Sequence, residues 1–303
     1  MPTKLDLARL GILLGLLFGL VSGPVLSADD QGWIPFENRN GLILLDVTVN
    51  GHEARATLDS GANLGAVSEG FAERVGIEAD YSQELQIVGL HGGQSVYAAR
   101  RFDLEMGGNV VPVTGLPLVP GDSFDVLIGR PMFDHGIVQI DYPNQRVRFL
   151  RAGSVDFESN VNVRRDREGQ ILVEATINDQ SALLLFDTGN SGVTLLTRQF
   201  VRRHELDEFE VPAAHVHGRG IVESGDINLL RLDSARIGPF PFDGFLAGYL
   251  PEAKGWLDGQ RPVPGTRIRQ RHANFDGMLG YEVLYNFLVT IDFSNSRLHL
   301  HLP

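Results

Sequence analysis

The chain has 303 residues, of which 43% are hydrophobic and 21% are charged, and its formal net charge is −12. A chain of this length and apolar content can bury a sizeable core, and it is long enough for about two domains. The acidic balance argues against a general nucleic-acid binder, because phosphate backbones attract proteins that carry a surplus of Lys and Arg.

The first residues have the pattern of a signal peptide. Lys4 and Arg9 precede an apolar run over residues 10–21, and small residues follow it. The alternative is an uncleaved anchor, but the run is interrupted by glycines and is shorter than the roughly 20 residues that a span needs. We therefore expect residues 1–28 to be removed and the mature chain to be exported without a stable membrane span. Because the chain has no cysteine, a bacterial periplasm fits better than a disulfide-rich secretory route.

The first half of the remaining chain reads as short strands with two brief helices. Apolar alternation and turn residues predict a hairpin at its start, and capping residues mark the first helix. The predicted order is a strand over residues 42–49, a turn at Asn50-Gly51, a returning strand that ends at Asp59, a short strand, a helix from Ser68 to before Gly76, a strand that ends at Gly129, a brief helix and a hairpin turning at residues 142–145.

The second half repeats this order. Residues 41–62 align without a gap with residues 169–190, and residues 124–150 match residues 275–301. The same elements are therefore predicted again, with a hairpin turn at Asn178-Asp179, a strand end at Asp187, a helix from Thr197, a strand end at Gly280 and a last hairpin at residues 293–296. Because helix is scarce elsewhere, the protein is predicted to be mostly β.

The two copies predict two lobes in one chain. We expect an N-terminal lobe over residues 29–155 and a C-terminal lobe over residues 156–303, with the boundary in a polar segment. The second lobe has extra sequence between its two blocks. Most of this sequence, residues 251–275, is rich in Pro, Gly and Arg and is expected to form a long surface loop.

Each first block ends in an Asp, a hydroxyl residue and a Gly. The two motifs are LDSGA, residues 58–62, and FDTGN, residues 186–190. One such triplet is most simply an ordinary β-turn, since Asp and Gly are common turn formers. Two copies are a stronger signal, because each ends an apolar strand and each has an apolar-apolar-Gly strand downstream. The pattern therefore points to a site shared by the two lobes.

These motifs, with VLIGR at residues 126–130 and GMLG at residues 277–280, resemble those of the retropepsin-like (clan AA) aspartic peptidases, in a two-lobed bacterial exported type. The resemblance covers nearly all of the chain from about Gly41 to Leu300. It implies a mostly β fold with two homologous acid-protease β-barrel lobes, which are related by a pseudo-twofold axis.

The resemblance also implies the chemistry. Asp59 and Asp187 would be the catalytic pair of an aspartic endopeptidase that hydrolyses a polypeptide substrate. Two carboxylates about 3 Å apart cannot both ionise, so the pair holds one proton and can both accept and donate one. Their pKa values belong to the pair, and the sequence assigns neither the base nor the acid.

The neighbouring residues have supporting roles by the same resemblance. Ser60 and Thr188 would bond across the axis, Gly61 and Gly189 would allow the tight turns, and Gly129, Arg130 and Gly280 would support the turns from the downstream strands. Tyr281 stands where Arg130 stands in the first lobe, so we expect a buttressing ion pair on one side only.

Two glycine-rich segments are candidate flaps, one in each lobe. They are residues 88–96 and 216–224, with His91, Gly92, Gly93, His217 and Gly218 as the candidate flap residues. The alternative is that they are only the mobile tips of hairpins, because glycine loops are common.

Other functions are less consistent with the sequence than the peptidase. A catalytically silent peptide-binding module with the same fold is the main alternative, and two-carboxylate glycoside hydrolysis fits poorly because it does not require paired turns. Histidine pairs such as residues 299–301 lack clustered acidic partners, so no metal or other cofactor is expected. Because one chain supplies both Asp residues, a monomer should suffice.

Overall fold

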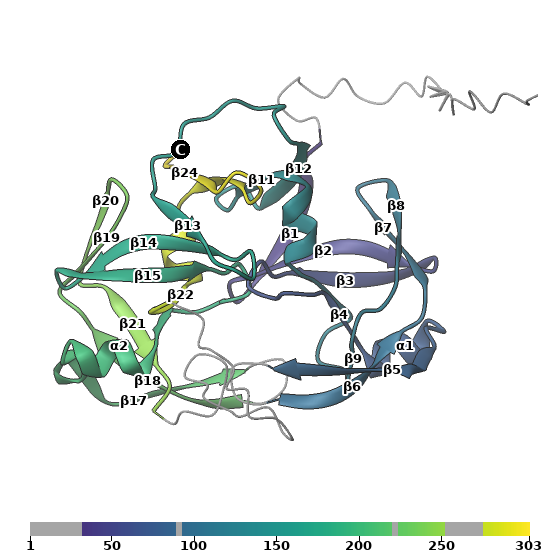
Figure 1. Cartoon of the computed structure of the whole chain (residues 1–303), viewed down its shortest axis with the longest axis horizontal. Helices are drawn as coiled ribbons and strands as arrows, with labels where there is room; N and C mark the ends of the chain where they lie inside the picture. The colour runs from purple at the N-terminus through teal and green to yellow at the C-terminus, as the bar shows by residue number, and fades with distance from the viewer. Residues whose placement is uncertain (1–31, 89–92, 220–223, 252–274) are drawn as a thin grey trace, which may run out of the picture. The chain divides into compact units, whose positions relative to one another are not determined.

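The computed structural model of the protein describes residues 32–88, 93–219, 224–251 and 275–303 (Figure 1). The expected signal peptide lies outside these residues, and so does the expected surface loop except for its two end residues, Pro251 and Phe275. None of the helices in the described ranges combines the length and the apolar content of a membrane span.

Each lobe begins its core with the predicted hairpin. Strands β2 (Leu42–Val49) and β3 (His52–Leu58) pair antiparallel, as do β14 (Ile171–Ile177) and β15 (Gln180–Phe186). All four turn residues, 50–51 and 178–179, have positive φ, between 43° and 80°. This is the backbone of a type I′ turn, which Asn, Asp and Gly tolerate. Both predicted hairpins are therefore confirmed.

A short strand and a capped helix follow each hairpin. Strand β4 (Ala66–Ser68) leads into α1 (Glu69–Arg74), and β16 (Thr194–Leu196) leads into α2 (Arg198–Arg203). The hydroxyl of Ser68 accepts the Phe71 N–H at 3.3 Å, and that of Thr197 accepts the Phe200 N–H at 3.1 Å. These bonds satisfy first-turn donors, so both helices start where the capping residues predict.

The apolar-apolar-Gly strands are central in each lobe. Strand β10 (Val126–Ile128) lies between β3, which is parallel to it, and β4, which is antiparallel. Strand β22 (Gly277–Leu279) lies in the same way between β15 and β16. All residues of both strands are buried, which explains why their sequences are apolar without alternation. Each strand holds the end of the hairpin that carries the Asp.

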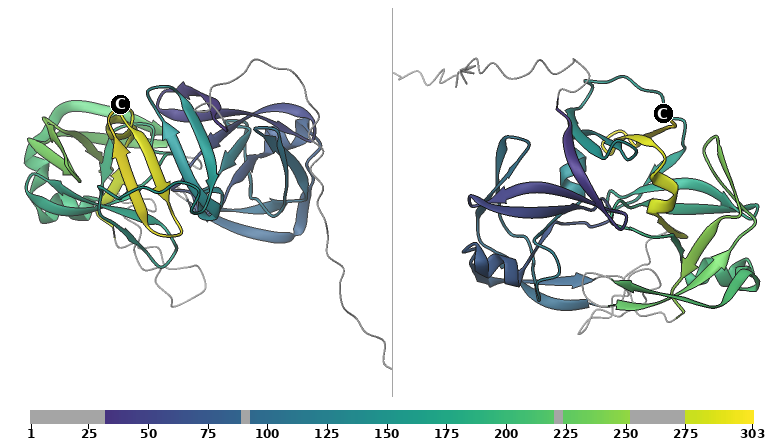
Figure 2. Two further views of the ribbon diagram at one scale, coloured as in Figure 1. Left: turned by 90° about the horizontal axis from the view of Figure 1, so that it is seen from above. Right: turned by 180° about the vertical axis from the view of Figure 1, so that it is seen from behind.

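The last hairpins of the two lobes form one sheet. Strands β11 (Gly136–Asp141) and β12 (Arg146–Arg151) come from the first lobe, and β23 (Leu288–Asp292) and β24 (Arg297–His301) come from the second. The order is β24-β23-β11-β12-β1, where β1 is Ile34–Arg39, and β11 pairs antiparallel with β23. We call this the interlobe sheet; Figure 2 shows its two hairpins side by side.

The remaining elements complete the two lobes. They are β5 (Ala79–Val88), β6 (Gly93–Ala99), β7 (Phe102–Met106), β8 (Asn109–Val113), β9 (Leu118–Val119) and the 3-10 helix η2 (Arg130–His135) in the first lobe, and β13 (Val163–Arg165), the 3-10 helix η3 (Leu206–Phe209), β17 (Glu210–Arg219), β18 (Ser224–Arg231), β19 (Ser234–Ile237), β20 (Phe240–Asp243), β21 (Leu246–Tyr249) and α3 (Tyr281–Leu284) in the second. Within the described residues, the strands form a twelve-stranded, a ten-stranded and a two-stranded sheet.

Two long hairpins lie on the other side of the ends of β3 and β15 from the interlobe sheet. These are β5–β6 and β17–β18, which lie at the bottom of Figure 1 and of the right-hand view in Figure 2, whereas the interlobe sheet lies at the top. The β5–β6 pair forms its own two-stranded sheet, whereas β18 also pairs with β21. The fold is thus mostly β with two lobes of the retropepsin-like kind, as expected. The boundary at residues 155–156 falls between β12 and β13 and stays a prediction.

Candidate active site

The two Asp residues of the repeated motif lie at the ends of β3 and β15. Each follows a strand end with no solvent exposure, Leu58 in one lobe and Phe186 in the other. The Asp59 N–H donates to the Ile128 carbonyl at 2.9 Å, so the central strand β10 holds this turn directly. Asp187 is 4% exposed, and Asp59 is half-buried. Apolar strands therefore place both carboxyl groups in a largely buried position.

The glycines of the two motifs bring the carboxyl groups together. A Cβ added to Gly61 would lie 2.4 Å from Asp187 Cγ, and one added to Gly189 would lie 2.4 Å from Asp59 Cγ. Any larger residue would therefore displace the carboxyl group of the opposite lobe. The two carboxyl groups are also hydrogen-bonded to each other. The structure thus places Asp59 and Asp187 side by side, with one glycine packed against each.

Ser60 and Thr188 join the two turns by four hydrogen bonds. Each hydroxyl accepts the other residue's backbone N–H, at 2.9 Å for Ser60 N–H to Thr188 Oγ1 and 3.0 Å for Thr188 N–H to Ser60 Oγ. Each hydroxyl also donates to the opposite strand end, Thr188 Oγ1 to the Leu58 carbonyl at 2.9 Å and Ser60 Oγ to the Phe186 carbonyl at 3.0 Å. The network is symmetric although one residue is Ser and the other Thr.

The environment of the pair favours keeping a proton. Burial raises the pKa of Asp187 well above its usual value, and the neighbouring Asp59 charge raises it further. Burial also raises the pKa of Asp59, but hydrogen bonds from the Ala62 and Gly61 backbone N–H groups and from Asp187 oppose that rise. Since the carboxyl groups repel each other when both are ionised, the pair can hold one proton and one negative charge at a pH where isolated carboxyl groups are ionised.

The supporting glycines lie behind the turns. A Cβ on Gly129 would lie 2.4 Å from the Leu64 carbonyl carbon, and one on Gly280 would lie 2.4 Å from the Gly192 carbonyl oxygen. Both glycines therefore let a central strand pass close to the loop that follows an Asp-containing turn.

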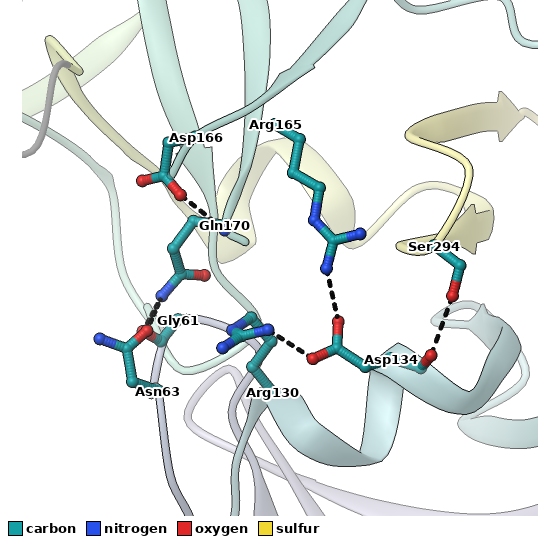
Figure 3. A network of polar contacts seen from close by, with 8 residues as sticks. All are labelled: Gly61, Asn63, Arg130, Asp134, Arg165, Asp166, Gln170 and Ser294. Carbon is teal, nitrogen blue, oxygen red and sulfur yellow. Dashed lines mark hydrogen bonds and ion pairs between the residues drawn. The ribbon is translucent and has the colours of Figure 1, made fainter. Parts of the chain in front are cut away.

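Arg130 and Tyr281 occupy matching positions but make different contacts. Arg130 pairs with Asp134, which also accepts from Arg165 Nη2 at 3.2 Å (Figure 3). The Tyr281 hydroxyl instead accepts from Asn38 Nδ2 at 2.7 Å. Arg130 thus makes its ion pair in one lobe, where Tyr281 makes a neutral hydrogen bond in the other.

The sequence motifs do not predict two polar residues that lie at the site. Gln170 is 2% exposed, and its Nε2 donates to the Gly61 carbonyl at 2.9 Å. Glu282 accepts the Thr194 N–H at 2.5 Å, and burial raises the pKa of Glu282 to about 7. Gln170 lies 109 residues from Gly61, so no local pattern links them. The sequence signal for Gln170 is the repeat, because it aligns polar Gln170 with apolar Leu42 of the first lobe.

The candidate flaps are only partly within the described residues. His91 and Gly92 lie outside them. Gly93 begins β6, and His217 and Gly218 lie in β17, where their backbones pair with Asp226 and Gly225 of β18. The role of these residues as flaps stays a prediction. Among the described residues, no group of three or more His, Asp or Glu side chains is arranged to hold a metal ion.

Comparison with known proteins finds a protease domain in each lobe. The family model described as gag-polyprotein putative aspartyl protease matches residues 45–135, and the model described as aspartyl protease matches residues 173–283. DNA damage-inducible protein 1 of Yarrowia lipolytica is 25% identical over 96 residues, which are 31% of this chain. The match spans 24% of that relative's length. Together these similarities support a retropepsin-like family.

Proposed function

With an aspartyl-protease domain in each lobe, we propose that the chain is an active aspartic endopeptidase that uses Asp59 and Asp187 as its catalytic pair. The observation that carries this proposal is the position of the two carboxyl groups, each packed against the glycine of the opposite lobe and hydrogen-bonded to the other. Such a pair, holding one proton, has both a base and an acid available at the same place.

The chemistry follows from that single shared proton. The ionised carboxylate takes a proton from a water molecule, whose oxygen attacks the carbonyl carbon of the scissile peptide bond. The protonated carboxyl gives its proton to the carbonyl oxygen, which forms a neutral diol. Then the first carboxyl protonates the leaving nitrogen while the second recovers a proton from the diol, and the C–N bond breaks. The pair returns to its starting state with one proton.

The remaining parts of the proposal have support from the sequence. An extended polypeptide is the substrate class that the family resemblance implies. A monomer suffices because one chain carries both Asp residues. Export through the N-terminal segment to a bacterial periplasm is supported by its signal-peptide pattern alone and stays a prediction.

Two substitutions test the proposed function. Asp59→Asn and Asp187→Asn each remove a carboxyl that the mechanism needs, so each should lower kcat by about a thousandfold or more. The measurement is mass spectrometry of a diverse library of denatured-protein peptides after digestion at acidic to neutral pH. Asp179→Asn is the matched control. Asp179 is an exposed turn residue of the lobe that carries Asp187, and Asn tolerates its positive φ of 61°.

The outcomes separate the proposal from its main alternative. Cleavage by the wild type and by Asp179→Asn, but not by the two active-site variants, supports the peptidase. Near-full activity in either active-site variant would contradict the mechanism. If the wild type retains peptides without cutting any, the chain is instead a catalytically silent peptide-binding module.

A further inference from the structure

The peptide group between Gly61 and Ala62 is hydrogen-bonded at both ends. Its N–H, from Ala62, donates to Asp59 Oδ1 at 2.9 Å. Its carbonyl, from Gly61, accepts from Gln170 Nε2 at 2.9 Å (Figure 3). A donor on the carbonyl oxygen polarises the peptide group, which strengthens the bond from its N–H to a negative acceptor. Gln170 therefore acts on Asp59 through one intervening peptide group. We call this chain of two bonds the Gln170 relay.

The orientation of the Gln170 amide is set by its partner. A backbone carbonyl can only accept, so the amide nitrogen must face Gly61. The same nitrogen donates to Asn63 Oδ1 at 2.8 Å. The amide oxygen Oε1 is buried and finds no hydrogen-bond partner in the described part of the chain. An unsatisfied buried oxygen costs free energy that an apolar side chain would avoid, so packing alone does not explain a Gln here.

A glycine turn brings Gln170 from the second lobe to the first. The Gln170 N–H donates to Asp166 Oδ1 at 2.8 Å, which closes the turn. Gly169 has a φ of +88°, and a Cβ there would lie 2.9 Å from Arg130 Nη1. A side chain at this position would be strained and would press on the arginine. The turn thus reaches the Asp59 side only because residue 169 is Gly.

The Asp187 side has no such relay. Its turn receives the Gly189 N–H on Asp187 Oδ1 at 2.8 Å, from the peptide group between Thr188 and Gly189. The position aligned with Gln170 is Leu42, which has no side-chain donor. The carbonyl of that peptide group belongs to Thr188, and no side chain in the described ranges donates a hydrogen bond to it. The two otherwise symmetric carboxyl groups therefore differ in what lies behind them.

From this one-sided relay, and on the premise of the proposed peptidase function, we propose that Gln170 is a positioning residue that holds Asp59 as the ionised member of the pair. Asp59 is then the base that takes the proton from water, and Asp187 is the acid that gives its proton to the peptide oxygen. The protons move as in the mechanism above, so Asp59 later protonates the leaving nitrogen and Asp187 recovers a proton from the diol.

The assignment rests on the one-sided side-chain donor. Burial raises the pKa of both carboxyl groups, and backbone N–H groups oppose the rise in each, from Ala62 and Gly61 at Asp59 and from Gly189 and Gly61 at Asp187. Among the described residues, the other titratable or charged groups around the pair and the relay are Arg130, Asp134, Arg165, Asp166, Tyr142, Tyr281 and Glu282. Arg130 and Arg165 are paired with Asp134, and Asp166 accepts the Gln170 N–H.

Gln170→Met tests the relay by removing the N–H donor while keeping an unbranched side chain of similar length. Without the relay, the ionised form of Asp59 is less stabilised, so the acidic limb of the kcat/KM profile should move up by about 0.5 to 1 pH unit. At the optimum, kcat should fall about tenfold with KM within about twofold. Leu42→Met is the matched control at the aligned position and should keep the wild-type profile.

Two further measurements make the result decisive. In Gln170→Glu, a protonated Glu can again donate to the Gly61 carbonyl, so kcat should approach the wild-type value at low pH and fall below it as the Glu ionises. Carboxyl ¹³C NMR titration, assigned with Asp59→Asn, should show a higher apparent pKa for Asp59 in Gln170→Met than in wild type. Thermal unfolding confirms that each variant is folded.

The outcomes distinguish failure of the relay from failure of the proposed function. If the wild type cleaves peptides but the pH profile and the Asp59 titration are the same in Gln170→Met, the relay is overturned and the peptidase stands. A loss of stability and of kcat with an unmoved profile overturns it equally, since Gln170 would then be only structural. If the wild type cleaves nothing, the proposed function falls, and the NMR titration still decides whether Gln170 acts on Asp59.

Discussion

At the scale of single residues, the site holds acidic groups where water does not stabilise their charge. Asp187 is 4% exposed, and burial raises its pKa well above the usual value. A carboxyl group that binds its proton more tightly in the folded chain than in the unfolded chain lowers stability as the pH rises from its unfolded pKa to its folded pKa. Above the folded pKa, that loss is complete. The proposed catalytic pair should therefore destabilise the fold at neutral pH.

Asp187→Asn should relieve this cost. Asn has the same shape and no charge, so at pH 7 the variant should be more stable than wild type, because it has no buried carboxyl group to ionise. The gain should shrink as the pH falls toward about 4, where Asp is protonated in both states. Thermal unfolding of both proteins from pH 4 to pH 7 measures it. A gain that does not depend on pH would contradict the argument.

Glu282 also titrates between pH 4 and pH 7, but it does not affect the stability difference between wild type and Asp187→Asn. Burial raises its pKa to about 7, so it also lowers stability increasingly as the pH rises from about 4.5 to 7. Glu282 is present in both proteins, and its contribution therefore cancels in their difference. Its place next to the turn that carries Asp187, on the Thr194 N–H, shows that the two Asp-containing turns have different polar support.

At the scale of elements, the repeated hairpin, turn and central strand form the unit that carries each Asp. Ser60 and Thr188 connect the two units, and both side chains are buried. Each hydroxyl accepts one bond and donates one, so losing a hydroxyl leaves a buried N–H and a buried carbonyl without their partners. Buried groups without partners are costly, and this makes the hydroxyl itself more important than the methyl group of Thr.

Thr188→Val and Thr188→Ser should therefore differ sharply. Val keeps the shape of Thr but leaves the Ser60 N–H and the Leu58 carbonyl unsatisfied, so we expect a loss of about 2 to 4 kcal/mol in unfolding free energy and at least tenfold lower kcat. Thr188→Ser is the matched control, since Ser60 already makes the equivalent bonds. Urea unfolding and peptide cleavage assays measure both effects. Equal behaviour of Val and Ser would mean that the hydroxyl bonds contribute little.

At the scale of the whole molecule, the lobes share both a sheet and a core. Strand β11 of the first lobe pairs with β23 of the second over five residue pairs, from Ile137 with Asp292 to Asp141 with Leu288. Phe133 packs on Phe293 at a ring distance of 5.1 Å, and Phe293 contacts Phe186 beside the second turn at 6.4 Å. One cluster of buried apolar side chains includes residues of both lobes. Unfolding one lobe would therefore expose the core of the other.

This shared core predicts cooperative unfolding. Scanning calorimetry of the chain should show a single transition, with a calorimetric enthalpy close to the van't Hoff enthalpy. The two-state test matters because a two-domain chain with a small interface would give two transitions instead. Two resolved transitions, or a ratio of the enthalpies near two, would contradict the continuous interlobe sheet.

The local features of the fold could be predicted because their causes are local. Asn50-Gly51 and Asn178-Asp179 adopt positive φ, which their own residue types tolerate. Ser68 and Thr197 cap the helices that begin directly after them. The repeat also predicts that two similar lobes each carry one Asp. None of these inferences needs to know how the lobes dock.

The sequence by itself thus determined the hairpins, the capped helices, the two-lobe repeat and the pair of Asp motifs. Tertiary structure alone decided the order of strands in the interlobe sheet, the burial of Glu282 and the contact of Gln170 with the Gly61 carbonyl. The physical reason is that these contacts join residues more than 80 positions apart, as with the 88 that separate Thr194 from Glu282. Such contacts depend on how the surfaces of the two lobes fit together, and at these contacts the two similar lobes differ from each other.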